Sequence, residues 1–259
     1  MTNVYNFSDS ELLLFFMLLV RMSAFVASWP IFGTETISNQ VKILFAVALT
    51  MVVFPTLTFT VEQHQAVEQN LILLAMREGA IGLSIGYLGR FFFFAFRIAG
   101  EMISQAIGLS AAQMFNPSLG GQATAVEQFY LGLASLFYLG VNGHHFLITG
   151  LVSTCENVRI ATLSFNTSQF IGIAPMMHEV IELGLKLSAP VVISILVVNL
   201  ILGVVGKTVP QLNVLVTSFP INILIGFGLM IVTLPMLMDN MGEFLNSSTI
   251  KVFQLVKTF

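Results

Sequence analysis

The residues able to do chemistry in this 259-residue chain are few, and most of them interrupt apolar runs. The densest group lies between Gly79 and Glu101, where glycines and charged side chains recur. At 100° per residue they fall within about 120° of one another on a helix, away from a bulky aromatic face. Three charges facing lipid would cost roughly 8–10 kcal/mol, so this face is expected to meet protein or water. It comprises Gly79, Gly82, Gly86, Gly89, Arg90, Arg97, Gly100 and Glu101.

Three interpretations of this charged face remain open. Arg97 and Glu101, one turn apart, would form a pair that holds the helix against its neighbour. Arg90, Arg97 and Glu101 would alternatively relay protons or ions, and the third interpretation is a surface for a partner protein. Gly82 and Gly86 would let a neighbouring backbone approach closely. The residues predicted for buried charge and helix packing are therefore Gly82, Gly86, Arg90, Arg97 and Glu101.

The uncharged segment 108–122 is the second candidate site. Its Asn-Pro-Ser and Gly-Gly sequences should break a helix, although solvated loops are usually more polar than this one. Irregular backbone at membrane depth is tolerated only where protein or a water-filled cavity surrounds it. The segment is therefore either a buried connector or a plug in a conduit. The candidate plug residues are Gly108, Leu109, Met114, Phe115, Asn116, Pro117, Gly120 and Gly121.

No set of residues predicts an enzyme, a cofactor or a metal site. Adjacent His144 and His145 would point about 100° apart on a helix, so they cannot both bind one metal ion. The preceding Asn142-Gly143 instead predicts a turn between two helical arms. A single cysteine, Cys155, excludes an internal disulfide and a Cys/His zinc pattern. Neither a nucleophile–base set nor a phosphate-binding glycine loop is recognisable.

The composition indicates a membrane protein, or a subunit whose surface is covered almost everywhere by partner proteins. Charged residues make up 9% of the chain and hydrophobic residues 56%, with a mean hydropathy of +0.90. Thirteen acids and ten bases cannot cover the surface of a soluble protein of this size, which excludes a soluble enzyme. The bases are scattered rather than clustered, which argues against a nucleic-acid binder.

Apolar runs predict an all-α architecture built from six membrane-type helical segments. The runs are too long and too continuous for the strands of a barrel. Pro220 and Pro235 are expected to interrupt the last run, and residues 62–70 to form a short acidic connector. The runs are Leu12–Trp29, Ile43–Val61, Leu71–Gly100, Gln128–Cys155, Leu187–Gly206 and Thr208–Met238.

Several short motifs, in their order and spacing, make the chain similar to a known family. No single motif is diagnostic, but together they extend over nearly the whole chain, fading after Asp239. The chain resembles the FliR/SctT family of type III secretion export-apparatus proteins. The motifs are Trp29-Pro30-Ile31-Phe32, Val41-Lys42, Phe96 to Glu101, Gly108 to Ser110, Asn116-Pro117, Asn142-Gly143-His144, Val209 to Asn213 and Ser218 to Asn222.

The resemblance implies a non-enzymatic subunit of a flagellar export gate. Its expected partners are FliP and FliQ, which would form the conduit with it, together with FlhB, FlhA, membrane lipid and unfolded flagellar export substrates. Its expected location is the bacterial inner membrane, in the flagellar basal body, projecting towards the periplasm. The resemblance also implies a single domain over 1–259, with a FliP-like portion over about 1–180 and a FliQ-like hairpin and tail over about 181–259.

The plug loop of the family matches residues 108–122, so the resemblance implies that Met114, Phe115, Asn116 and Pro117 close the conduit. Relatives can carry an acid where this chain has the amide Asn116. The alternative is an independent secondary transporter or channel of six spans, with a polar site near Arg90, Arg97 and Glu101. A transporter often contains an internal repeat, and none is clear here.

Overall fold

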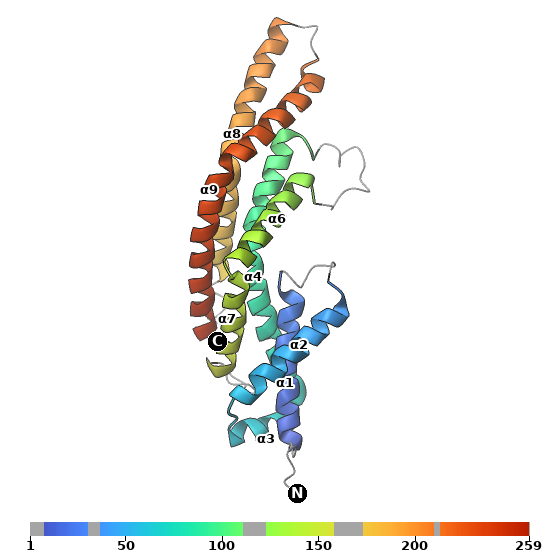
Figure 1. Cartoon of the computed structure of the whole chain (residues 1–259), viewed down its shortest axis with the longest axis vertical. Helices are drawn as coiled ribbons and strands as arrows, with labels where there is room; N and C mark the ends of the chain where they lie inside the picture. The colour runs from blue at the N-terminus through green and yellow to red at the C-terminus, as the bar shows by residue number, and fades with distance from the viewer. Residues whose placement is uncertain (1–7, 31–36, 111–122, 158–172, 210–212, 259) are drawn as a thin grey trace. The chain divides into compact units, whose positions relative to one another are not determined.

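The computed structural model describes residues 8–30, 37–110, 123–157, 173–209 and 213–258 (Figure 1). These residues form helices, with turns and short irregular stretches at some of their ends and no strand among them. The predicted all-α fold class is therefore confirmed. The elements are α1 (Asp9–Ser28), α2 (Asn39–Val53), the 3-10 turn η1 (Phe54–Thr56), α3 (Val61–Gln69), α4 (Leu71–Ile107), α6 (Ala125–Gly140), α7 (Gly143–Asn157), α8 (Ile173–Thr208) and α9 (Val214–Thr258).

Local sequence signals explain where several helices begin. Ser8 caps α1, and Glu11 returns a side-chain contact to the backbone of Ser8 in a reciprocal capping box. At α3, the Gln63 side chain accepts the Thr60 backbone N–H at 2.7 Å. The expectation of a short connector over 62–70 was therefore wrong, because this capping pair starts a helix there.

Among the described residues, five helices are long and apolar enough to cross a membrane. The pair α6 and α7 would count as a sixth, broken span. The break falls at Asn142, whose φ of 57° lies in the left-handed region. Asparagine tolerates that conformation better than most residues, so the predicted turn at Asn142-Gly143 is confirmed.

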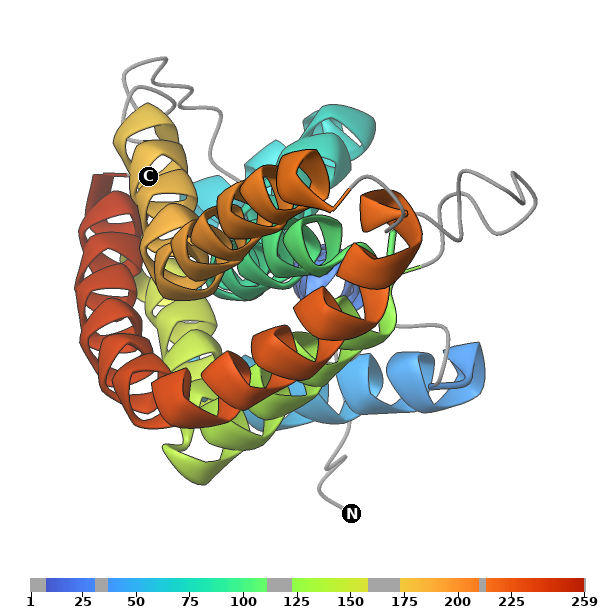
Figure 2. The same cartoon turned by 90° about the horizontal axis from the view of Figure 1, so that it is seen from above.

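The prolines of the last apolar run do not end a helix, contrary to the sequence expectation. Pro220 and Pro235 both lie inside α9, as Pro190 lies inside α8. Each proline removes one backbone hydrogen bond, which bends a helix more often than it stops one in an apolar setting. The course of α9 changes direction along its length in both views (Figures 1 and 2).

The chain divides into two compact units, and the long helix α4 contributes to both. The first unit contains residues 1–90, 142–174 and 247–259. Its described core is built on α1, where Leu14, Leu18, Met22 and Phe25 are completely buried. The ring of Trp29 stacks between Phe25 and Phe45, with centroid distances of 5.2 and 6.2 Å.

The second unit contains residues 91–141 and 175–246. Phe92 of α4 is its aromatic centre, with Phe96, Tyr138 and Phe244 around it at centroid distances of 5.0, 5.8 and 6.2 Å. In the same unit α8 and α9 form an antiparallel hairpin, visible in Figure 1. Asn222 joins its two arms by donating from Nδ2 to Oδ1 of Asn199 at 2.9 Å.

The helices differ sharply in how much of their apolar surface the chain itself covers. Within the most apolar stretches of α1 and α4, 39% and 44% of residues are buried. The corresponding values are 17% for α2, 11% for α8 and 22% for α9. The exposed apolar side chains of α8 and α9 therefore need lipid or another protein to cover them. They include Ile193, Leu196, Leu200, Val204, Val216, Leu224, Ile231 and Val232.

Candidate functional site

The predicted glycine face of α4 allows α1 to approach closely in the first unit. A Cβ atom on Gly82 would collide with the backbone carbonyl of Arg21 and would lie 3.0 Å from the Cβ of Ala24. A Cβ atom on Gly86 would collide with the side chain of Ser28. Small residues thus face each other four apart on both helices, as in tightly packed membrane helices. These contacts place Gly82 and Gly86 at the α1–α4 interface.

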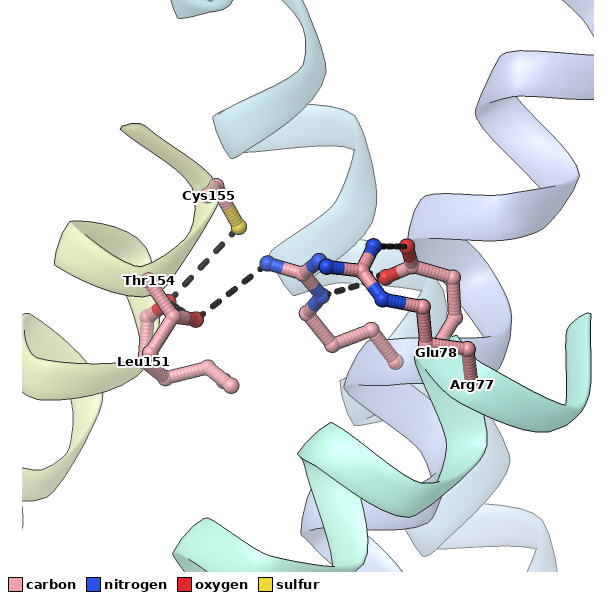
Figure 3. A network of polar contacts seen from close by, with 6 residues as sticks. Arg77, Glu78, Leu151, Thr154 and Cys155 are labelled. Atoms are coloured by element: carbon pink, nitrogen blue, oxygen red, sulfur yellow. Dashed lines mark hydrogen bonds and ion pairs between the residues drawn. The ribbon is translucent and has the colours of Figure 1, made fainter. Parts of the chain in front are cut away.

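Directly beside this interface lies a buried ion pair between α1 and α4. The Nε and Nη2 atoms of Arg21 lie 2.6 and 2.5 Å from Oε2 of Glu78, and neither side chain is exposed. Arg77, which is 5% exposed, places Nη1 3.6 Å from Oε1 of the same carboxylate (Figure 3). Removing one member of such a pair leaves an uncompensated buried charge, which costs about 3–5 kcal/mol.

The helix α7 joins the same network through a hydroxyl group. Arg21 Nη1 donates to Oγ1 of Thr154 at 3.3 Å, and this hydroxyl donates in turn to the backbone carbonyl of Leu151 at 2.5 Å. Cys155 is buried next to it and contacts the Leu151 carbonyl at 3.6 Å (Figure 3). The network therefore connects α1, α4 and α7 within one unit.

Sequence reasoning did not identify this network. Arg21 and Glu78 were visible as charges inside apolar runs, and such charges generally require partners. Their separation of 57 residues carries no signal of proximity. Only the packing of α1 against the glycine face brings them together.

Arg90 lies at the end of the same interface. Its Nε donates to the backbone carbonyl of Ser28 at 2.6 Å, which satisfies an acceptor at the C-terminal end of α1. Its guanidinium also lies 5.1 Å from the ring centre of Tyr87, within the range of a cation–π contact. Arg90 of α4 therefore caps the C-terminal end of α1 through this hydrogen bond.

Arg97 belongs to the second unit and has a different partner from the predicted one. Its Nε lies 2.7 Å from Oε1 of Glu127 on α6, whereas Glu101 accepts a 3.4 Å hydrogen bond from Gln105. The expected Arg97–Glu101 pair was therefore wrong. The Arg97 side chain is 54% exposed and Glu101 is also exposed, so neither is a buried charge in the isolated chain.

The first end of the candidate plug segment is fixed by a helix-terminating motif. Gly108 has a φ of +88°, and the Gly108 and Leu109 N–H groups donate to the carbonyls of Gln105 and Ser104. This pattern is a Schellman motif, in which glycine tolerates the left-handed conformation. A Cβ atom on Gly108 would lie 2.8 Å from the ring of Phe219 on α9. The other candidate plug residues lie outside the described residues: Met114, Phe115, Asn116, Pro117, Gly120 and Gly121.

The second end of the segment is fixed by Glu127. Thr124 caps α6 by accepting the Glu127 N–H at 3.3 Å, and Oε2 of Glu127 accepts the Thr124 N–H at 3.3 Å. The other carboxylate oxygen holds Arg97, so one side chain both caps α6 and ties it to α4. A Cβ atom on Gly100 would lie 2.7 Å from Cα of Glu127, so the two backbones touch here.

The two adjacent histidines lie in the first turn of α7, which begins at Gly143, and their ring centroids are 4.3 Å apart with nearly perpendicular planes. Throughout the described part of the chain, no three His, Cys, Asp or Glu side chains come together in a way that could hold a metal ion. Most of the charged side chains described above instead form ion pairs and hydrogen bonds that join neighbouring helices.

Comparison with known proteins gives consistent matches. The model of the family described as bacterial export proteins, family 1, matches residues 12–248. The chain is 33% identical to the flagellar biosynthetic protein FliR of Bacillus subtilis over 221 residues, covering 84% of this chain and 85% of that protein. It is 29% identical to FliR of Aquifex aeolicus, covering 86% of each chain, and 29% identical to FliR of Escherichia coli, covering 88% and 87%. The chain therefore belongs to the FliR family of bacterial export proteins.

Proposed function

We propose that this chain is a non-enzymatic subunit of the flagellar type III protein export gate, and that it forms the conduit with FliP and FliQ. The observation that carries the proposal is the family match over residues 12–248, together with the flagellar relatives. The apolar surface that α2, α8 and α9 leave exposed supports assembly with other subunits, since an isolated chain cannot cover it. FlhB and FlhA are further proposed partners, and unfolded flagellar subunits are the proposed cargo.

In this proposal the segment 108–122 is the plug that closes the conduit at rest. Its lack of formal charge suits a position enclosed by other subunits. The described residues at its two ends are held firmly, by the Schellman motif at Gly108 and by Glu127 at the start of α6. A closure element needs such fixed ends, because its position would otherwise vary from one complex to the next.

Residues of about 181–259, which include most of α8 and all of α9, are proposed as the FliQ-like part, and residues of about 1–180 as the FliP-like part. The low burial of α8 and α9 supports a role in which neighbouring subunits pack along both helices. The complex is proposed to lie in the bacterial inner membrane, within the flagellar basal body, and to project towards the periplasm.

The transporter alternative required a shared polar site at Arg90, Arg97 and Glu101. Each of these side chains has a separate neighbour: the Ser28 carbonyl for Arg90, Glu127 for Arg97 and Gln105 for Glu101. The first two contacts explain the arginines as structural links between helices. They therefore give no support to a solute or proton site.

The plug assignment is tested by replacing residues 111–122 with a Gly-Ser linker of the same length. This change keeps the Schellman motif and the Thr124 cap, but removes the bulky Met114, Phe115 and Leu119. We expect membranes that contain the assembled complex to leak ions above the wild-type level in a dye-release or conductance assay.

A matched control replaces residues 161–172, which are also twelve residues and lie between α7 and α8, with the same linker and should not raise leakage. Complex assembly is checked in parallel by co-purification of FliP and FliQ. Wild-type conductance in a fully assembled complex with the replaced 111–122 segment would contradict the plug assignment.

A further inference from the structure

Apolar packing alone does not define how far α1 slides along α4. The buried positions of α1 form rows one turn apart, with Leu14, Leu18, Met22 and Val26 in one row. A slide by four residues, about 6 Å, would exchange most of them for another apolar residue: Leu18 would take the place of Leu14, Met22 that of Leu18 and Val26 that of Met22. In the slide that moves each α1 residue back by four, Gly79 would face Ala24 in place of Val20, and Gly82 would face Phe25 and Ser28 in place of Arg21 and Ala24.

The second buried row of α1 is different because it contains a charge. Met17, Arg21, Phe25 and Trp29 follow one another at four-residue spacing, and all four are buried. In the observed register Arg21 lies against Glu78. A slide by one turn would bring Arg21 level with Leu74 or Gly82 and would leave both charges buried without each other.

We infer that the Arg21–Glu78 pair sets the register of α1 on α4. The helices run in parallel, since Val20 faces Gly79 and Ser28 faces Gly86. A buried polar contact that selects one register among several apolar ones is a known use of such pairs in helical assemblies. At the end of the interface, the contacts of Ser28 with Gly86 and Arg90 fit the same register.

Thr154 connects α7 to the Arg21–Glu78 pair. Its hydroxyl accepts from Arg21 and donates to the Leu151 carbonyl, so the guanidinium contacts both helices. Arg77 holds the second carboxylate oxygen of Glu78 and limits rotation of that side chain. The orientation of α7 is therefore linked to the register of α1.

Cysteine cross-linking measures the register directly. In a Cys155→Ala background, the pair V20C/G79C reports the observed register, since a Cβ on Gly79 would lie 3.7 Å from Cγ1 of Val20. The pair A24C/G79C reports a slide of one turn. Both pairs are oxidised in membranes that contain the full chain with its co-expressed partners.

With Arg21 and Glu78 present, only V20C/G79C should cross-link efficiently. In the double variant R21M/E78M, which replaces both charges with apolar side chains, cross-linking of A24C/G79C should rise by about tenfold or more. The matched control E182M/K186M removes an exposed ion pair of α8, whose atoms lie 2.7 Å apart, and should change neither yield. Unchanged exclusive cross-linking of V20C/G79C in R21M/E78M would overturn the inference.

A second variant keeps the test decisive if R21M/E78M does not accumulate. Glu78→Gln preserves the size of the side chain and removes its charge, and the native Cys155 then reports the position of α7. We expect maleimide labelling of the buried Cys155 to increase several-fold in Glu78→Gln. Wild-type labelling in that variant would also overturn the inference. Both readouts concern the first unit alone, so their outcome is independent of whether the chain acts in export.

Discussion

At the scale of residues, burial distinguishes the Arg21–Glu78 ion pair from the Arg97–Glu127 ion pair. Arg21 and Glu78 are both fully buried, whereas Arg97 is half exposed and only its partner Glu127 is covered. Exposed pairs are screened by water and contribute little, while breaking a buried pair leaves a charge without compensation. The same pairing chemistry therefore has different consequences in the two units.

We predict that Arg21→Met lowers the free energy of unfolding of the purified complex by about 3–5 kcal/mol. Arg97→Met should lower it by about 1 kcal/mol or less, because the Arg97 side chain is 54% exposed. Denaturant unfolding of the two variants and the wild type, monitored by circular dichroism, gives the comparison. Equal losses in the two variants would contradict the assigned difference.

The residue-level predictions from sequence were the least successful. The helical wheel indicated that Arg97 needs a partner of opposite charge. The predicted partner was Glu101, one turn away on the same helix, whereas the structure pairs Arg97 with Glu127 of α6. Residue spacing identifies neighbours only within one helix, so it could not predict a contact between Arg97 and Glu127. Arg21 and Glu78 were missed for the same reason, because each lies on a different helix.

At the scale of elements, the helices and their turns follow closely from the sequence. The apolar runs predicted the long helices, and Asn142-Gly143 correctly predicted a break, now located by the φ of 57° at Asn142. Pro220 and Pro235 were misread as interruptions, because the rule from soluble helices overstates their effect in long apolar ones. The start of α3 was missed although Thr60 and Gln63 have capping-box spacing.

Substitution of Asn142 tests the turn between α6 and α7. Asn142→Gly should leave the stability unchanged or raise it slightly, since glycine adopts positive φ without strain. Asn142→Val should lower the free energy of unfolding by about 1–2 kcal/mol, because a β-branched side chain is disfavoured there. A thermal melt of each purified complex measures both. Equal melting temperatures for the glycine and valine variants would show that no strain arises at this position.

The close contact of α4 with α6 depends on Gly100, which has no side chain to separate the two backbones. Gly100→Ala should lower the free energy of unfolding by about 1–3 kcal/mol, because the added methyl group would meet the Glu127 backbone at 2.7 Å. Gly132→Ala in α6 is the matched control, since nothing lies within 4 Å of its Cβ, and it should cause no loss. Chemical denaturation of both variants provides the measurement. A stable Gly100→Ala protein would mean that α6 can move away from α4 at little cost.

At the scale of the whole molecule, the buried charge network and the largest exposed apolar surfaces lie on different helices. Some charges are concentrated in a buried network, while long stretches of α8 and α9 expose apolar side chains with almost no charge. Composition alone predicted a membrane protein or a covered subunit, and it could not divide the apolar surface between core, lipid and partners. That division depends on which helices pack together, which only the fold provides.

We propose that this chain is one subunit of a gate with FliP and FliQ, and co-purification is the direct test of that assembly. The tagged chain is expressed alone and together with untagged FliP and FliQ, then purified in mild detergent and analysed by size and composition. We predict one defined complex containing all three proteins, and a poorly stable or aggregated chain when it is expressed alone. A chain that is monodisperse alone, or forms a stable homo-oligomer, and that retains neither FliP nor FliQ would contradict the proposed function.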